Sequence, residues 1–453
     1  MRAYIIVMYI LSFLYYKFGN GSILVMLMFY IFSVAPFVVK RLKNDVFDIG
    51  LIFVALYSLY ITSIPIGMVT GNTIEYEMFA LRYDVSLAYK VLYISGICPM
   101  LTFILLYYNN DPVNKSLEEN VKELNSLEVK RSKIVSYFFI LSGLVLYIFS
   151  IIKLGGLNYF KSSYVWNETS AQKGLMNGAF QLLSVGTIID FYIYLKTLKT
   201  SEEKLNIFKW RTIYIIVPVI VLNFFQGSRL PTLMFFLGMI LIYNSAYKKI
   251  PIRKVIPIAI VGVLLLGFWG YFRNSKSFKI TEDAKKLMFG GSVNYELQYN
   301  SYTAMSVTKV IESVDKVNYL KGLTILDGIT YSIPRMIFKS KDNYIFTNRW
   351  INDYNEETLI APLGGLNLSA QLLMNGGLVF SLIFMIVFGF LLHKIYLNTF
   401  KIEDSKLFYS LFISQFMISF VRDPMYISIK YLIQFCIVPY IIYKLLPLIK
   451  VKN

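Results

Sequence analysis

The sequence predicts an all-α polytopic membrane protein, and two observations carry this prediction. Hydrophobic residues make up 56% of the 453-residue chain, and its mean hydropathy is +0.56. A soluble domain of this length has too little interior to hide so much apolar surface. Long apolar runs with few charges also recur along the whole chain, and each approaches the roughly 20 residues that a membrane-spanning helix needs.

About twelve segments meet this length criterion. They lie near residues 3–18, 21–39, 46–66, 87–108, 134–154, 175–195, 212–227, 230–247, 255–272, 367–392, 406–421 and 426–446. The first resembles a signal peptide in its charge and apolar core. No small-x-small cleavage site follows it, so we interpret it as a retained first helix.

The charges of the loops predict the orientation of the chain. Loops after the second, fourth, sixth, eighth and tenth predicted spans are rich in Lys and Arg, as in KRLKND and KKIPIRK, whereas short loops of opposite parity carry few. Cytoplasmic loops are the basic ones, so both termini are predicted to be cytoplasmic. The basic cytoplasmic loops also account for the net charge of +18. The sequence contains no folded basic domain, so we expect no nucleic-acid partner.

One long segment interrupts this regular alternation. Residues 1–272 contain the first nine predicted spans, residues 273–366 form a large external loop, and residues 367–453 contain the last three spans. The positive charges of so long a loop do not bear on the orientation. Its amphipathic stretches, 283–289 and 322–338, predict short helices packed on the membrane surface.

The sequence lacks the motifs of several common kinds of enzyme chemistry. It has no GxxxxGK[ST] phosphate loop and no GxGxxG after a strand. The two cysteines, Cys98 and Cys436, lie in apolar runs, and the single histidine, His393, is predicted on the cytoplasmic side. We therefore expect no metal site, no cofactor, and no serine–histidine–aspartate triad on the outer face.

Arginines on the predicted outer face are the first candidates for a site. These are Arg229, Arg273, Arg335 and Arg422. A guanidinium group suits bidentate recognition of phosphate or carboxylate. The alternative for each is an arginine that snorkels from a helix end. For Arg229 and Arg422 we favour a functional role, because each lies in a very short turn with a helix breaker within two residues.

Carboxylates on the same face are candidates for acid–base chemistry. Glu75 and Asp84 lie in the external segment 67–86, and Asp423 follows Arg422. A solvated loop or a local ion pair is the alternative for each of them. Among the few charges inside predicted spans are Lys90, Asp190 and Lys430.

The segment that opens the tenth predicted span carries two amides. Gln371 and Asn375 are four residues apart and share one helix face. Gly376 and Gly377 follow and allow close helix approach. The two amides have two possible roles: contact with a substrate glycan, or a polar bond between helices.

These features together resemble the bacterial O-antigen and capsule repeat-unit polymerases of the Wzy type. The topology resembles that family over nearly the whole chain, and a GSR turn precedes the large loop. IPRMIFKSK (333–341), LNLSAQLLMNGG (366–377) and FVRDP (420–424) are similar to segments of that family. Where the family commonly has a glutamate before Asn-Phe-Gly, this chain has Gln371 and Asn375-Gly376-Gly377, which leaves that position without a catalytic acid.

The resemblance implies a membrane glycosyltransferase of the GT-C-like kind in the bacterial cytoplasmic membrane. The growing glycan on undecaprenyl pyrophosphate would be transferred to a hydroxyl of a new lipid-linked unit, as in O-antigen, capsular or exopolysaccharide synthesis. A chain-length regulator and a flippase of the same pathway would be partners. Arg229, Arg335 and Arg422 would bind the diphosphate, with Arg273 and Lys341 as helpers. The general base would be Glu75, Asp84 or Asp423.

Three other classes of protein remain alternatives. An O-antigen ligase shares the topology, but that type places a histidine in the large loop, which here has none. A flippase or transporter usually shows two similar halves and short loops, and this chain shows neither. A structural assembly partner is the third alternative.

Overall fold

A computed structural model describes most of the chain. The described residues are 2–70, 85–107, 126–156, 171–201, 205–226, 229–258, 260–262, 319–333, 341–347 and 366–445, with the single positions 307, 310, 311, 337, 338, 340 and 350. Within these residues all regular structure is helical and no strand occurs. The predicted all-α class is therefore confirmed for the described part of the chain.

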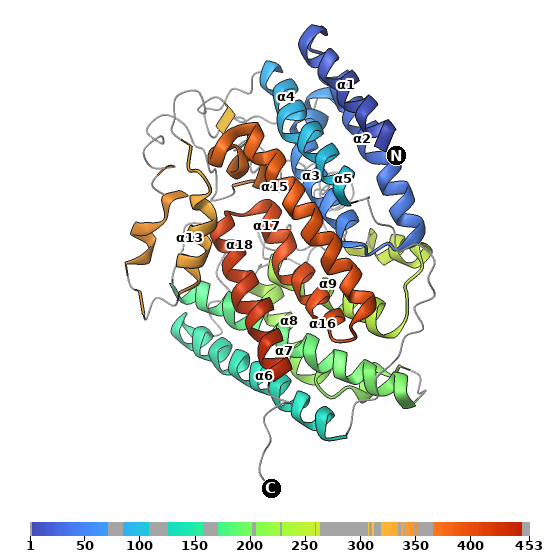
Figure 1. The fold of residues 1–453 in the computed structure, drawn as a ribbon. Helices are drawn as coiled ribbons and strands as arrows, with labels where there is room; N and C mark the ends of the chain where they lie inside the picture. The colour runs from blue at the N-terminus through green and yellow to red at the C-terminus, as the bar shows by residue number, and fades with distance from the viewer. Residues whose placement is uncertain are drawn as a thin grey trace, which may run out of the picture. The chain divides into compact units, whose positions relative to one another are not determined.

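The described helices fall into three groups along the chain (Figure 1). The first group is α1 (Arg2–Phe18), α2 (Ile23–Asn44), α3 (Ile49–Val69), α4 (Val85–Val91), the π-helical turn η2 (Leu92–Ile97) and α5 (Cys98–Tyr107). The second is α6 (Ser126–Lys153), α7 (Ala171–Ser201), the short turn η4 (Ile207–Lys209), α8 (Ile213–Gln226), α9 (Arg229–Ile242) and η5 (Tyr243–Tyr247). The third is α13 (Leu323–Ser332), η8 (Lys341–Tyr344), α15 (Leu368–Lys401), α16 (Ser405–Phe412), η10 (Ile413–Met417), α17 (Ile418–Arg422), α18 (Met425–Tyr431), η11 (Leu432–Ile437) and α19 (Val438–Leu445).

Seven helical stretches in the described residues are long and apolar enough to cross a membrane. They are Ile23–Asn44, Ala88–Tyr107, Val129–Lys153, Gly174–Ser201, Leu230–Tyr247, Leu368–Thr399 and Met425–Leu445. Shorter apolar stretches, Ile49–Ser63 and Ile213–Asn223, lie in α3 and α8. The predicted span 255–272 falls mostly outside the described residues. The seven long apolar helices indicate a multi-pass membrane protein.

The distribution of side chains on α6 agrees with a lipid environment. Phe138, Val145 and Ile152 are more than half exposed, while Ser136 and Ser150 are buried. In water this arrangement would leave apolar surface hydrated. In a bilayer the apolar side chains face lipid, and small polar residues allow close contact between helices.

The helices pack into two compact units, each built from separate stretches of the chain. Unit 1 comprises Met1–Ser116, Tyr295–Leu397 and Met417–Tyr431. Unit 2 comprises Leu117–Asn294, Asn398–Phe416 and Leu432–Asn453. Residues far apart in sequence therefore meet within one unit, and the described part of the large predicted loop that forms α13 belongs to unit 1.

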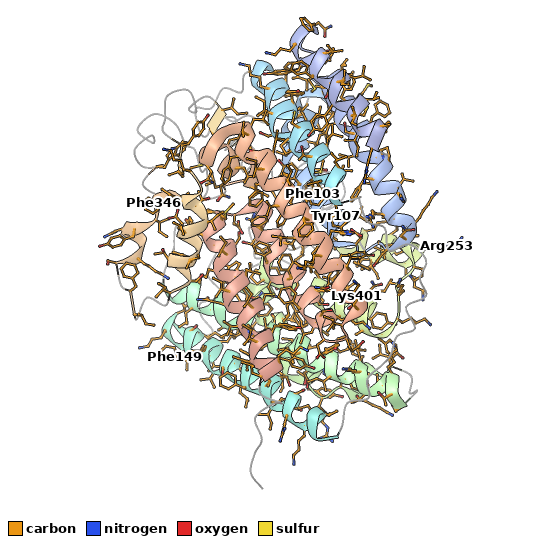
Figure 2. All side chains as sticks on the ribbon, in the orientation of Figure 1. Phe103, Tyr107, Phe149, Arg253, Phe346 and Lys401 are labelled. Atoms are coloured by element: carbon orange, nitrogen blue, oxygen red, sulfur yellow. The ribbon has the colours of Figure 1, made fainter. Side chains whose placement is uncertain are left out.

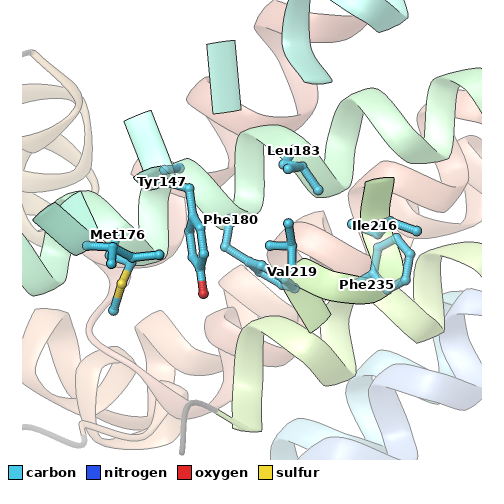
Figure 3. Packing of buried hydrophobic residues seen from close by; sticks show 9 residues of the cluster. Tyr147, Met176, Phe180, Leu183, Ile216, Val219 and Phe235 are labelled. Atoms are coloured by element: carbon cyan, nitrogen blue, oxygen red, sulfur yellow. The ribbon is translucent and has the colours of Figure 1, made fainter. Parts of the chain in front are cut away.

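The core of unit 2 joins four helices, α6 to α9 (Figure 3). Its buried residues are Tyr147, Ile151, Met176, Ala179, Phe180, Leu183, Ile216, Val219 and Phe235. The α6 and α7 helices approach closely because Gly143 and Gly186 face the partner backbone. An added Cβ would lie 2.6 Å from the Leu183 nitrogen at the first glycine and 2.7 Å from the Ile140 nitrogen at the second.

Aromatic rings fill the interior of unit 1. The Phe53 ring on α3 contacts Phe103 on α5 and Phe388 on α15, with centroid distances of 4.7 and 5.1 Å. Phe103 also stacks on Tyr107 at 5.5 Å, and both rings are labelled in Figure 2. This packing holds the Phe388 part of α15 beside the first helices of the chain, and a hydrogen bond between Tyr57 on α3 and Ser369 joins α3 to the part of α15 that carries Gln371 and Asn375.

Candidate functional site

The α15 helix is broken at the two glycines that follow Asn375. Gly377 has φ 64° and ψ −154°, a conformation that an L residue with a side chain adopts only under strain. The break frees backbone carbonyls, and two of them accept hydrogen bonds from the chain before α13. Leu320 N donates to Met374 O at 2.9 Å, and Lys321 N donates to Asn375 O at 2.8 Å. A predicted continuous span is thus two segments that anchor part of the large loop.

The Asn375 side chain extends this anchor to the start of α13. Its Oδ1 accepts from Gly322 N at 2.9 Å, and its Nδ2 donates to Thr324 Oγ1 at 2.7 Å. Asn375 is buried, and its amide satisfies groups at the N-terminus of α13 that have no partner within the helix. These hydrogen bonds of Asn375 hold the start of α13 against α15.

The α13 helix packs directly against α18 (Figure 1). Gly328 makes this approach possible, since a Cβ at that position would lie 2.5 Å from Ile429 Cβ. The Tyr331 ring meets the Tyr426 ring edge-on, with a centroid distance of 4.9 Å. The predicted helix within 322–338 is therefore confirmed by α13, and α18 supplies its packing surface.

Gln371 holds the turn between α17 and α18. Its Nε2 donates to Asp423 O at 3.1 Å and to Leu366 O at 2.8 Å, and its Oε1 accepts from Met425 N. One fully buried amide thus binds the backbone on both sides of Pro424. Buried backbone groups at a helix break need such partners in a membrane protein. The Arg422–Asp423 turn is consequently fixed to α15.

Arg422 and Asp423 lie together at this fixed turn. Arg422 Nε is 3.7 Å from Asp423 Oδ1, and their side chains are 24% and 17% exposed. Ser419 Oγ donates to the second carboxylate oxygen at 2.8 Å. The pair combines a guanidinium with a carboxylate that remains partly accessible.

The segment after α13 is tied back to this helix by two buried charges. Asp327 accepts from Phe346 N, Thr347 N and Thr347 Oγ1 at 2.6–2.8 Å. Lys341 Nζ donates to Tyr331 O and Ile333 O, both at 2.6 Å. The lysine therefore satisfies carbonyls at the C-terminal end of α13, where the helix dipole favours a cation.

Five of the predicted site residues thus belong to unit 1; contacts join Gln371, Asn375, Arg422 and Asp423, whereas Lys341 lies at the other end of α13. Gln371 contacts Asp423, which pairs with Arg422. Gln371 O also accepts from Asn375 Nδ2 at 2.7 Å. Asn375 in turn binds α13, whose C-terminal end holds Lys341. Four other predicted residues, Glu75, Asp84, Arg273 and Arg335, lie outside the described residues.

Arg229 belongs to unit 2, where it is the first residue of α9. The backbone of α9 is described at this position, and the Arg229 side chain lies outside the description. Asn223 Nδ2 on α8 donates to Thr232 Oγ1 on α9 at 2.6 Å, in the first turn of that helix. This buried bond joins the two helices close to the turn that Arg229 follows.

Sequence reasoning did not assign a site role to Asp327, Tyr331 or Lys430. Lys430 was identifiable as an ionisable residue inside a predicted span, which is by itself a sign of function. Asp327 and Tyr331 lie four residues apart on α13, so they share one face of an amphipathic helix. Their partners come from η8, the following residues and α18, and no sequence spacing reveals those contacts.

A guanidinium and a carboxylate lie side by side at one partly exposed turn, and groups of these kinds suit anion binding and proton transfer. Among the described residues no group of three or more His, Cys, Asp or Glu side chains is arranged to hold a metal ion. No family model matches the chain, and no curated protein and no solved structure matches it either.

Proposed function

We propose that the chain is a membrane glycosyltransferase that polymerises oligosaccharide repeat units carried on undecaprenyl pyrophosphate. The observation that carries the proposal is the docking of the large loop, through α13, onto the helices that present Arg422 and Asp423. A polymerase must hold two long lipid-linked substrates in register at the bilayer surface. A loop anchored on membrane helices beside an arginine–carboxylate turn suits that task.

The proposed topology follows from the positive-inside pattern. The chain has about twelve spans of ~20 residues, both termini in the cytoplasm and the 273–366 segment outside, in a GT-C-like arrangement. The protein lies in the bacterial cytoplasmic membrane. It works with a flippase that delivers the lipid-linked units and with a chain-length regulator.

The reaction is a displacement at the anomeric carbon of the donor glycan. A hydroxyl of the incoming unit attacks this carbon, its bond to the diphosphate oxygen breaks, and undecaprenyl pyrophosphate leaves. Arg422, with Arg229 and Arg335, stabilises the charge on the leaving diphosphate. Asp423 accepts the proton of the attacking hydroxyl as general base, a role for which Glu75 and Asp84 are the other candidates.

The positions of Gln371 and Asn375 favour a supporting role in this reaction. Both side chains bind backbone or side-chain groups of the protein, and both are buried. They keep the Arg422–Asp423 turn and α13 in place, and a glycan reaches them only if these bonds open.

The test is reconstitution of the purified protein with lipid-diphosphate-linked repeat units. A ladder of longer glycans formed without nucleotide supports polymerisation. A single transfer to an acceptor other than a repeat unit would identify a ligase. Passage of unchanged units across a liposome membrane would identify a transporter.

The site assignment has its own test at Arg229. Both Arg229→Ala and Arg229→Lys should lose chain extension while the protein is still expressed, because lysine keeps the charge and removes the planar fork. Full activity of the alanine variant would refute the assignment.

A further inference from the structure

The α13 helix turns large apolar side chains outward and its most polar side chains inward. Ile325, Leu326 and Ile329 are 39%, 51% and 53% exposed. Asp327, the only charged residue of the helix, is 1% exposed, and Thr324 is buried as well. A helix that lies flat on a membrane surface turns its charged residues to the water. Helices surrounded by lipid show the arrangement found in α13, with charged residues turned towards the protein.

The α13 helix lies beside α18, which opens the apolar stretch Met425–Leu445 (Figure 1). Thr324 Oγ1 donates to Met425 Sδ at 3.6 Å, and Gly328 faces Ile429. The second contact lies four residues beyond the first in both helices, so the two helices run in the same direction. The stretch that α18 opens is long enough to cross a membrane. A helix that runs along its first residues therefore enters the same environment.

The α13 helix covers the surface that α18 would otherwise turn to lipid. In the stretch Met425–Leu445 the exposed large apolar residues are Val438, Ile441 and Leu445, and all of them follow α18. None of the seven residues Met425–Tyr431 is exposed, and α13 packs directly on them. The apolar side chains that stay exposed beside α18 are those of α13.

After α13 the chain comes back along the same helix, and two buried charges bind backbone groups there. Lys341 Nζ donates to Tyr331 O and Ile333 O at the end of α13. Asp327, in the middle of the helix, accepts from Thr347 N at 2.8 Å. Non-helical backbone within a membrane needs such partners from the protein, because lipid offers none. The segment therefore has the bonds that it needs to enter a bilayer and leave it on the same side.

We infer that α13 is a re-entrant helix, and that its row of Ile325, Leu326 and Ile329 contacts the acyl chains of membrane lipids. A re-entrant helix enters the membrane and returns on the side from which it came. This position replaces the membrane surface predicted for the segment 322–338. The inference goes beyond the proposed glycosyltransferase activity and does not depend on it.

The experiment measures the surroundings of single nitroxide labels on the full-length protein in phosphatidylcholine nanodiscs. Leu326→Cys and Ile329→Cys are labelled separately in a protein that carries Cys98→Ala and Cys436→Ala. Electron paramagnetic resonance gives the collision rates of each label with oxygen, which concentrates in hydrocarbon, and with a nickel chelate, which stays in water. The ratio of oxygen to nickel collisions should be at least about tenfold higher at both positions than for a label in water.

Two matched controls set the scale of this ratio. Val145→Cys places the label at an exposed apolar position of α6, within the apolar stretch Val129–Lys153, and its ratio should be within about twofold of that for Leu326→Cys. Lys248→Cys places it at an exposed position in the basic connection after η5 and represents a label in water. Thermal unfolding of each labelled protein shows whether the fold is kept. Ile325→Cys supplies a third position if one of the first two variants does not fold.

Each outcome decides the inference. Ratios at Leu326 and Ile329 that match the ratio at Val145 support it. Ratios close to that at Lys248 would overturn it, because the row would then face water. Low collision rates with both reagents would also overturn it, because another part of the chain or a second copy would then cover the row.

Discussion

Two turns of unit 1 each carry an arginine and an aspartate, and they differ in how the pair is buried. Arg41 Nη1 is 3.4 Å from Asp48 Oδ2 between α2 and α3, where the side chains are 3% and 0% exposed. Arg422 and Asp423, between α17 and α18, are 24% and 17% exposed. The first pair is enclosed by protein, and the second remains accessible.

The enclosed pair has partners that explain its burial. Asp48 Oδ1 accepts from Gly50 N at 2.8 Å and Leu51 N at 3.1 Å, so it caps α3. The Tyr107 hydroxyl donates to the same oxygen at 2.8 Å, and the Arg41 guanidinium lies 5.0 Å from the Tyr107 ring centroid. The Asp48 carboxylate of this pair thus joins the start of α3 to Tyr107 on α5. At the Arg422 turn Gln371 binds the backbone, and the two charged side chains stay partly exposed.

Removal of the enclosed carboxylate should have the largest effect on stability. Asp48→Ala leaves the Arg41 charge buried and uncaps α3, and should cost about 3–5 kcal/mol of the free energy of unfolding. Asp423→Ala should cost at most about 1 kcal/mol, because its pair is partly solvated. Thermal unfolding of both variants in detergent makes the comparison. Equal losses at the two positions would show that burial does not distinguish them.

Removal of the amide that supports the accessible pair should have the next largest effect. Gln371→Leu leaves Asp423 O and Met425 N without their buried partner, and should cost about 1–3 kcal/mol. Chain extension should fall with it, because the Arg422–Asp423 turn is no longer fixed. Gln371→Glu keeps an acceptor for Met425 N, and its protonated carboxyl group can also donate to Asp423 O. At low pH this variant should therefore lose less stability than Gln371→Leu. If Gln371→Leu were as stable and active as the unchanged protein, the turn would not depend on this amide.

Substitution of the accessible arginine should have the smallest effect on stability and a large effect on activity. Arg422→Lys keeps the charge at a partly exposed position, so the free energy of unfolding should change by less than about 0.5 kcal/mol. Chain extension should fall at least tenfold, because the planar guanidinium fork is lost. Unfolding and the glycan ladder are measured on the same preparation. A variant that extends glycans at the normal rate would remove Arg422 from the site.

The apolar helices of the described residues were predictable from the sequence. The apolar segments were readable because a membrane helix must be apolar over its whole length, whatever its neighbours are. Polar residues are also easy to recognise within or beside apolar segments, which is how the sequence pointed to Arg422, Asp423 and Gln371. The Gly376–Gly377 pair predicted close packing, but the break at Gly377 depends on a backbone conformation that the sequence permits and does not require.

The tertiary structure decided what those residues touch. The contact between Gly328 and Ile429, the bonds of Gln371 to Asp423 O and Met425 N, and the contact of Lys430 with the Tyr331 ring all join segments that are far apart along the chain. Polar groups in an apolar environment must find partners, and only the packed helices determine which partners are within reach. For that reason the difference between the buried Arg41–Asp48 pair and the partly exposed Arg422–Asp423 pair became visible only in the fold.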